Sequence, residues 1–71
     1  MPRPIKLSLV LRVLKDEGFF FVSQKGSHAK FRKIGAMTAT VIVKMSKKEI
    51  PYGTFQAIVE QSGLHEDKFV K

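Results

Sequence analysis

The hydrophobic pattern of this chain changes its period twice, and the change limits the folds that the chain can adopt. Across residues 5–18 the apolar side chains recur at helical spacing, and Gly18 stands where such a helix would end. Across residues 19–45 they follow the pattern of β-strands, and across residues 54–63 helical spacing returns. The predicted order is therefore helix, strands, helix.

The middle region divides into three predicted strands. They are FFFVSQK at 19–25, HAKFRKI at 28–34 and TATVIVKM at 38–45. Gly26 to His28 and then Gly35 supply turns, and strands joined by short turns form an antiparallel meander. The chain is too short to cover both faces of a sheet. We therefore predict an α+β fold with a three-stranded antiparallel sheet and both helices on one face.

The end of the chain predicts a well-bounded helix and a further turn. The segment KKEIPYG, residues 47–53, interrupts regular structure. Thr54 is the candidate N-cap of the second helix, and Gly63 is its C-terminal stop. The last eight residues predict a final helical turn that packs Leu64 and Phe69.

The length of the chain limits it to one core. It has 71 residues, of which 44% are hydrophobic, enough for one small domain and too few for two cores. We therefore expect a single domain spanning residues 1–71. A core of this size supplies only about 3–5 kcal/mol, so a partner chain could add stability. The sequence leaves the oligomeric state open.

Positive charge is concentrated in the middle of the chain. The formal net charge is +7, from thirteen Lys and Arg against six Asp and Glu. Seven of the basic residues lie between Gly18 and Lys48, where there is no acidic residue, and the rest of the chain is balanced. Such a concentrated field attracts polyanions, either nucleic acid or an acidic protein. The alternative is a solvated face that keeps the protein soluble.

Composition also indicates a compartment. The chain has no cysteine, which excludes disulfides, thiolate metal sites and a cysteine nucleophile, and fits a reducing cytoplasm. Arg12 interrupts the apolar run near the start, and no small-residue cleavage site follows, so a signal peptide is not expected. No segment approaches the roughly 18 consecutive apolar residues of a membrane span. We expect a soluble, cytoplasmic protein that makes no use of a membrane.

His28 is the residue best suited to chemistry. Strand alternation places it on one face with Lys30 and Arg32, opposite Phe31, which should face the core. Imidazole can take or give a proton near neutral pH, and RNA carries its own nucleophile, the 2′-hydroxyl. No histidine pair has metal-ligand spacing and no carboxylate lies near His28 in sequence, so a metal site or a triad has no support. His28 is either a general acid or base, a residue that only binds phosphate, or a polar residue on a solvated strand with no further role.

Several further residues are candidates for binding RNA. They are Lys25, Gly26, Ser27, Lys30, Arg32, Lys47 and Lys48. Gly26 and Ser27 could equally serve only the turn, and the two lysines before the second helix could simply be solvated. Phe20 and Tyr52 could stack on bases, although Phe20 is expected in the core. His65, beside two acidic residues, is expected to be a surface residue.

Two long stretches of the sequence are similar to one known family. LKDEGFFFVSQKGSHAKFRK (residues 14–33) and VIVKMSKKEIPYGTFQAIVEQSGL (residues 41–64) resemble the HicA (YcfA-like) toxins of bacterial toxin–antitoxin pairs. The most specific matches are Gly18, Phe19, Gly26, Ser27, His28, Phe31, Ile50, Gly53, Thr54, Ile58 and Gly63. The resemblance implies a double-stranded-RNA-binding-like α-β-β-β-α fold. It also implies an mRNA interferase, a metal-independent endoribonuclease without a cofactor that cleaves mRNA with His28 and is silenced by a HicB-type antitoxin.

The sequence departs from this family at one point that concerns the chemistry. Many relatives have proline and histidine where this chain has Lys44, Met45 and Ser46, so a function resting on that second histidine is absent. The partner of His28 in proton transfer is therefore open, with Glu49 as a carboxylate that folding could supply. Two other functions also remain open: a non-catalytic RNA-binding module, and a basic face that docks an acidic protein.

Overall fold

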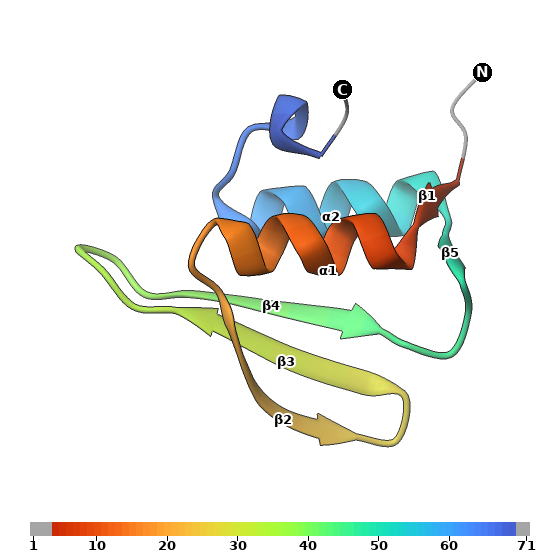
Figure 1. Cartoon of the computed structure of the whole chain (residues 1–71), viewed down its shortest axis with the longest axis horizontal. Helices are drawn as coiled ribbons and strands as arrows, with labels where there is room; N and C mark the ends of the chain where they lie inside the picture. The colour runs from red at the N-terminus through yellow and green to blue at the C-terminus, as the bar shows by residue number, and fades with distance from the viewer. Residues whose placement is uncertain (1–3, 70–71) are drawn as a thin grey trace.

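The computed structural model describes residues 4–69, which form two helices, five strands and a short 3₁₀ helix (Figure 1). In chain order the elements are β1 (Ile5–Lys6), α1 (Leu7–Asp16), β2 (Phe20–Lys25), β3 (His28–Lys33), β4 (Ala39–Lys44), β5 (Glu49–Ile50), α2 (Tyr52–Ser62) and the 3₁₀ helix η1 (Glu66–Lys68). The three central strands form one antiparallel sheet in the order β2-β3-β4. The α+β fold and its α-β-β-β-α order are confirmed.

A two-residue turn joins β2 to β3 and sets the register of the sheet. Lys25 pairs with His28, so only Gly26 and Ser27 lie between the strands. Gly26 has φ +60°. Among the described residues, positive φ occurs only at glycines. Glycine with positive φ at the first central position is the pattern of a type II′ turn, whose twist matches that of a hairpin.

A bulge interrupts β2. Phe21 pairs with Phe31 and Ser23 pairs with Lys30, which leaves Val22 as an extra residue. An extra residue reverses the alternation of side chains between the two faces of a strand. On the face that carries Arg32, Lys30 and His28, β2 therefore presents an even-numbered residue before Val22 and odd-numbered residues after it.

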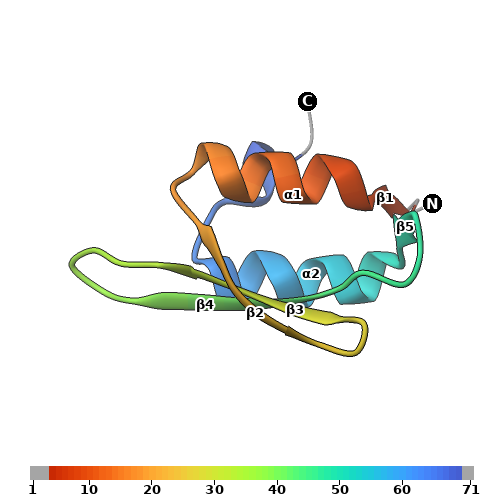
Figure 2. The same cartoon turned by 60° about the horizontal axis from the view of Figure 1, so that its bottom comes forward.

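Both helices lie on the same side of the sheet (Figure 2). α1 buries Val10 and Leu14, and α2 buries Phe55 and Ile58, as their helical spacing predicts. Together with side chains of the sheet, they form one core. Its buried members are Val10, Leu14, Phe19, Val41, Val43, Ile50, Phe55, Ile58 and Phe69.

The C-terminal segment closes this core. η1 positions Phe69, which is fully buried and packs edge-to-face on Phe55 with ring centroids 5.4 Å apart. Leu64 is partly buried against the same cluster. The predicted final turn and its packing residues Leu64 and Phe69 are confirmed, while Val70 and Lys71 lie outside the described residues.

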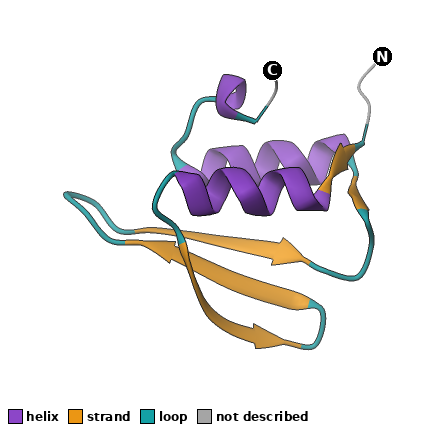
Figure 3. Ribbon diagram, viewed as in Figure 1, coloured by secondary structure: helices purple, strands orange, loops and turns teal. Residues whose placement is uncertain are grey.

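The structure corrects the predicted start of each helix. The first helix begins at Leu7, because Ile5 and Lys6 instead form β1, which pairs with β5 within the stretch predicted to be irregular (Figure 3). The second helix begins at Tyr52, and its N-cap is Pro51 rather than Thr54. The ring of proline fixes a φ compatible with the start of a helix, and the Pro51 carbonyl accepts the first helical bond from Phe55.

The predicted helix stops are confirmed. Gly18 and Gly63 have φ of +96° and +71°, and each directly follows the last turn of its helix. A left-handed residue at this position is the usual end of a helix, and glycine adopts it without steric cost. The chain therefore leaves α1 toward β2, and α2 toward η1, where the sequence predicts.

Candidate nucleic-acid interface

One face of the β2-β3-β4 sheet points away from the helices and carries four of the five basic residues of these strands, whereas Lys33 lies on the other face. We call it the open face. From the register its members are Phe20, Ser23, Lys25, His28, Lys30, Arg32, Thr40, Ile42 and Lys44. None of them is buried, and none is acidic. A sheet face with one sign of charge and exposed apolar groups suits a polyanion that also carries apolar rings.

His28 lies in the middle of one row across the open face. Its register partners are Lys25 on β2 and Lys44 on β4, and all three residues are exposed. Side chains of directly opposed residues in an antiparallel pair lie close together, with Cβ atoms about 4.5–5.5 Å apart. The imidazole is therefore flanked by an ammonium group on each side. The sequence prediction included Lys25 but missed Lys44, which is sixteen positions from His28 along the chain.

The β2–β3 turn holds the start of β3, and with it His28, in place. The side-chain amide Nε2 of Gln24 donates to the Gly26 carbonyl at 3.0 Å. The Met45 N–H donates to the Ser27 carbonyl at 2.6 Å, which continues the β3–β4 ladder beyond His28. Gly26 and Ser27 thus have a structural role at the turn, beside the His28 row.

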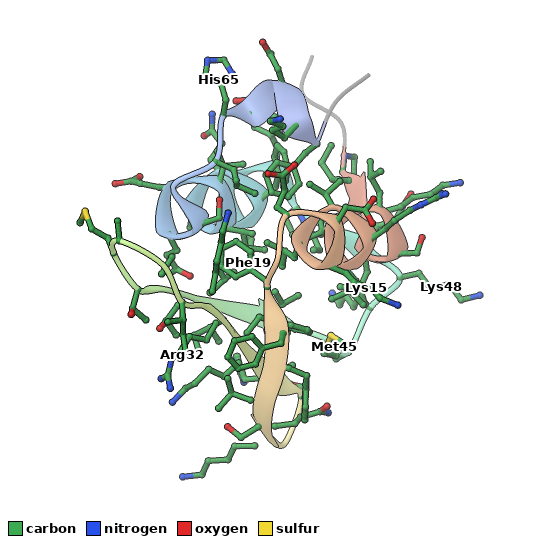
Figure 4. The ribbon with its side chains drawn as sticks, turned by 60° about the vertical axis from the view of Figure 1, so that its left-hand side comes forward. Lys15, Phe19, Arg32, Met45, Lys48 and His65 are labelled. Atoms are coloured by element: carbon green, nitrogen blue, oxygen red, sulfur yellow. The ribbon has the colours of Figure 1, made fainter. Side chains whose placement is uncertain are left out.

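The two remaining rows extend the interface along β3. Lys30 lies between Ser23 and Ile42, and Arg32 lies between Phe20 and Thr40. The Nε of Arg32 donates to Thr40 Oγ1 at 3.4 Å. Figure 4 shows Arg32 projecting from the sheet on the side away from the helices. The structure therefore places Lys30 and Arg32 on the face of His28, as strand alternation predicts, and the register of β2 adds Lys25.

The family model described as the HicA toxin of bacterial toxin–antitoxin systems matches residues 8–64. This chain belongs to the HicA toxin family. No curated protein is significantly similar to it. Membership in the HicA family implies a partner, the antitoxin of the pair. Among residues 4–69, every helix is too short or too polar to span a membrane.

Met45 occupies the region where many HicA relatives carry a second histidine. It directly follows β4, is half-buried and packs against the core. It therefore faces away from the row of His28. In this HicA-family protein His28 is the only histidine on the open face.

Phe20 was expected in the core, and that prediction is wrong. Its side chain is 46% exposed, whereas Phe19 is buried and fills the core position that follows α1. Because the extra residue Val22 lies between them, Phe20 and Lys25 project from the same face of β2, which is the open face. Phe21 lies on the helix side and packs edge-to-face on Phe31 at 5.9 Å.

Lys47 and Lys48 lie apart from the HicA open face. They follow β4 in the loop that leads to β5, and with Lys6 they line a hollow of about 910 Å³ at the start of α1. Figure 4 shows Lys48 and Arg32 projecting toward different sides of the molecule. Glu49 pairs with Lys6 in the small β1–β5 sheet, so it is not on the strand ladder that holds His28.

Two other sequence candidates have roles elsewhere. The hydroxyl of Tyr52 donates to a carboxylate oxygen of Glu66 at 3.2 Å, and its ring packs on Phe55. His65 caps η1, accepting from the Asp67 N–H at 3.3 Å, and is 78% exposed above the helices (Figure 4). Across residues 4–69 no three His, Asp or Glu side chains come together as metal ligands would.

Proposed function

We propose that this HicA-family toxin is an mRNA interferase, a metal-independent endoribonuclease in which His28 is the catalytic residue. The observation that carries the proposal is the exposed row of Lys25, His28 and Lys44, on a sheet face without an acidic residue. A single imidazole between two cations suits a reaction in which a proton moves while negative charge develops on phosphorus.

RNA cleavage of this type needs little from the protein. The 2′-oxygen forms a bond to phosphorus, and the bond from phosphorus to the 5′-oxygen breaks. The 2′-hydroxyl loses its proton and the departing 5′-oxygen gains one. The products end in a 2′,3′-cyclic phosphate and a 5′-hydroxyl. His28 supplies one of the two proton transfers, since an imidazole can act as general acid or general base near neutral pH.

The cations supply binding and charge stabilisation. Lys25 and Lys44, one on each side of His28, contact the non-bridging oxygens of the scissile phosphate. Lys30 and Arg32, farther along β3, bind neighbouring phosphates, and Ser27 orients the substrate beside the turn. This arrangement fits an mRNA substrate, and a HicB-type antitoxin would silence the protein by covering the same face.

One observation favours a second function. Met45, in the region where many relatives carry a histidine, packs against the core, so the open face holds one imidazole and no carboxylate. A face with only cations and one histidine can bind RNA without cleaving it. This alternative predicts salt-dependent RNA binding, intact RNA and little loss of affinity for His28→Ala.

A comparison of two histidine variants tests the proposal. Wild type, His28→Ala and His65→Ala are incubated in EDTA with 5′-labelled RNA, and the fragment ends are analysed. We expect wild type and His65→Ala to leave cyclic phosphate ends, and His28→Ala to cleave roughly 10²- to 10⁴-fold more slowly. His65 is a matched control because it is exposed on η1, away from the open face. Circular dichroism establishes that each variant is folded.

The outcomes separate the two functions. Wild-type rates with His28→Ala would remove His28 from the mechanism. If all three proteins bind RNA and leave it intact, the protein is a non-catalytic RNA-binding module. Growth arrest on expression of the wild type, but not of His28→Ala, is expected in cells.

A further inference from the structure

Phe20 is exposed without a structural reason. Its neighbour Phe19 fills the core position after α1, and Phe20 leaves 46% of its surface in solvent. On the open face it stands opposite Arg32, and Arg32 stands opposite Thr40. An aromatic ring and a guanidinium therefore lie side by side at one end of β3, while His28 lies at the other end.

The bulge at Val22 is what places this ring on the face that carries His28. With strict alternation, Lys25 would share its face with Ser23 and Phe21, and Phe20 would point toward the helices. The observed register instead pairs Phe20 with Arg32 and Phe21 with Phe31. Bulges beside functional sites commonly redirect one side chain in this way.

Exposed aromatic rings on basic sheets bind nucleobases. Every base has an apolar face that can stack on phenylalanine, and a guanidinium can stack or bind phosphate beside it. The hydrogen bond from Arg32 Nε to Thr40 Oγ1 keeps that guanidinium on the open face. From His28 to Arg32 the chain rises by four residues, about 13 Å at the spacing of a β-strand. This distance corresponds to a few nucleotides of extended RNA.

We propose that Phe20 and Arg32 form a base-stacking subsite that selects single-stranded RNA. One unpaired base stacks on Phe20, and the adjacent phosphate binds Arg32. The strand then follows β3 past Lys30, so that a phosphate a few nucleotides away reaches His28. Base faces in a duplex are already stacked, so duplex RNA cannot use this subsite. The inference rests on the proposed function, because it positions RNA relative to His28.

Tryptophan fluorescence tests the subsite directly. The chain has no tryptophan, so Phe20→Trp introduces a single reporter at the subsite. Phe21→Trp is the matched control: it changes the same residue type, next in sequence and 55% exposed, on the opposite face. Both substitutions are combined with His28→Ala so that the RNA is not consumed. We expect single-stranded RNA to quench the indole of the Phe20→Trp variant and to leave that of Phe21→Trp nearly unchanged.

Affinity gives a second readout. Phe20→Leu should weaken binding of single-stranded RNA roughly tenfold, whereas Phe21→Leu should change it less than about twofold. The same RNA annealed into a duplex should bind more weakly than the single strand. Circular dichroism checks that all variants are folded.

Failure of the subsite can be told from failure of the ribonuclease. RNA binding without selective quenching, or tighter binding of the duplex, overturns the subsite and leaves cleavage by the wild type to be judged separately. Selective quenching of the Phe20→Trp variant, together with no cleavage of RNA by the wild type, supports the subsite and overturns the ribonuclease. No RNA binding by any variant overturns both.

Discussion

Lys44 lies directly opposite His28 in the antiparallel β3–β4 ladder, and both side chains project from the open face. Lys25 flanks His28 on the other side, from β2. A phosphate bound at His28 would therefore also lie between two ammonium groups. This relationship makes Lys44 the residue that best distinguishes a catalytic row from a general basic patch.

Lys44→Ala should slow RNA cleavage about 10- to 100-fold, because a positioned cation stabilises charge that develops on phosphorus. Lys44→Arg should recover part of the rate. Lys15→Ala removes the same charge from the exposed surface of α1 and should leave cleavage unchanged. Initial rates on one labelled RNA measure all three. Equal cleavage rates for Lys44→Ala and Lys15→Ala would show that Lys44 does not contribute to cleavage.

Salt dependence should map the extent of the interface. Each phosphate contact on single-stranded RNA contributes about 0.7 to the slope of log affinity against log salt concentration. Lys30→Ala should lower the slope by about that amount, because Lys30 lies between the His28 and Arg32 rows. Lys48→Ala should leave it nearly unchanged, because Lys48 lies in the β4–β5 loop. An equal fall for Lys48→Ala would extend the interface to Lys47 and Lys48, as the sequence predicts.

The two glycines Gly26 and Gly53 should respond to alanine in opposite directions. Gly26 has φ +60° and open space around its Cα, so Gly26→Ala adds backbone strain without a clash and should cost about 1 kcal/mol. Gly53 lies inside α2 without positive φ, so Gly53→Ala should stabilise the protein by up to about 0.5–1 kcal/mol. Urea unfolding measures both. An unchanged free energy of unfolding for Gly26→Ala would show that the turn accepts alanine at this position without strain.

Phe69 should matter to stability although it lies outside the residues that match the HicA family. It is fully buried against Phe55, so Phe69→Ala should cost about 3–5 kcal/mol. A core of this size supplies only about 3–5 kcal/mol, so the midpoint of urea unfolding should fall sharply. Phe21→Ala removes an equal ring from an exposed position and should cost much less. Similar midpoints for the two variants would place Phe69 outside the core.

Local patterns in the sequence were sufficient to predict those features that depend on a single helix or strand. Gly18 and Gly63 end their helices because glycine alone adopts positive φ cheaply, a property of single residues. His28, Lys30 and Arg32 share a face because β3 is the regular central strand and alternates without interruption. Pro51, by contrast, was interpreted only as a break in regular structure, although its fixed φ is also compatible with the start of a helix.

The sequence by itself determined the order of the two helices and the three central strands, the C-terminal ends of the helices and the basic face of β3, because periodicity and backbone preference act over a few residues. Only the tertiary structure decided which residues stand beside His28. Lys44 reaches it through the register of β4, and Phe20 reaches the same face through the bulge at Val22. The register depends on how strands far apart in the chain pair and pack together, and a shift of one residue moves every side chain of a strand to the other face.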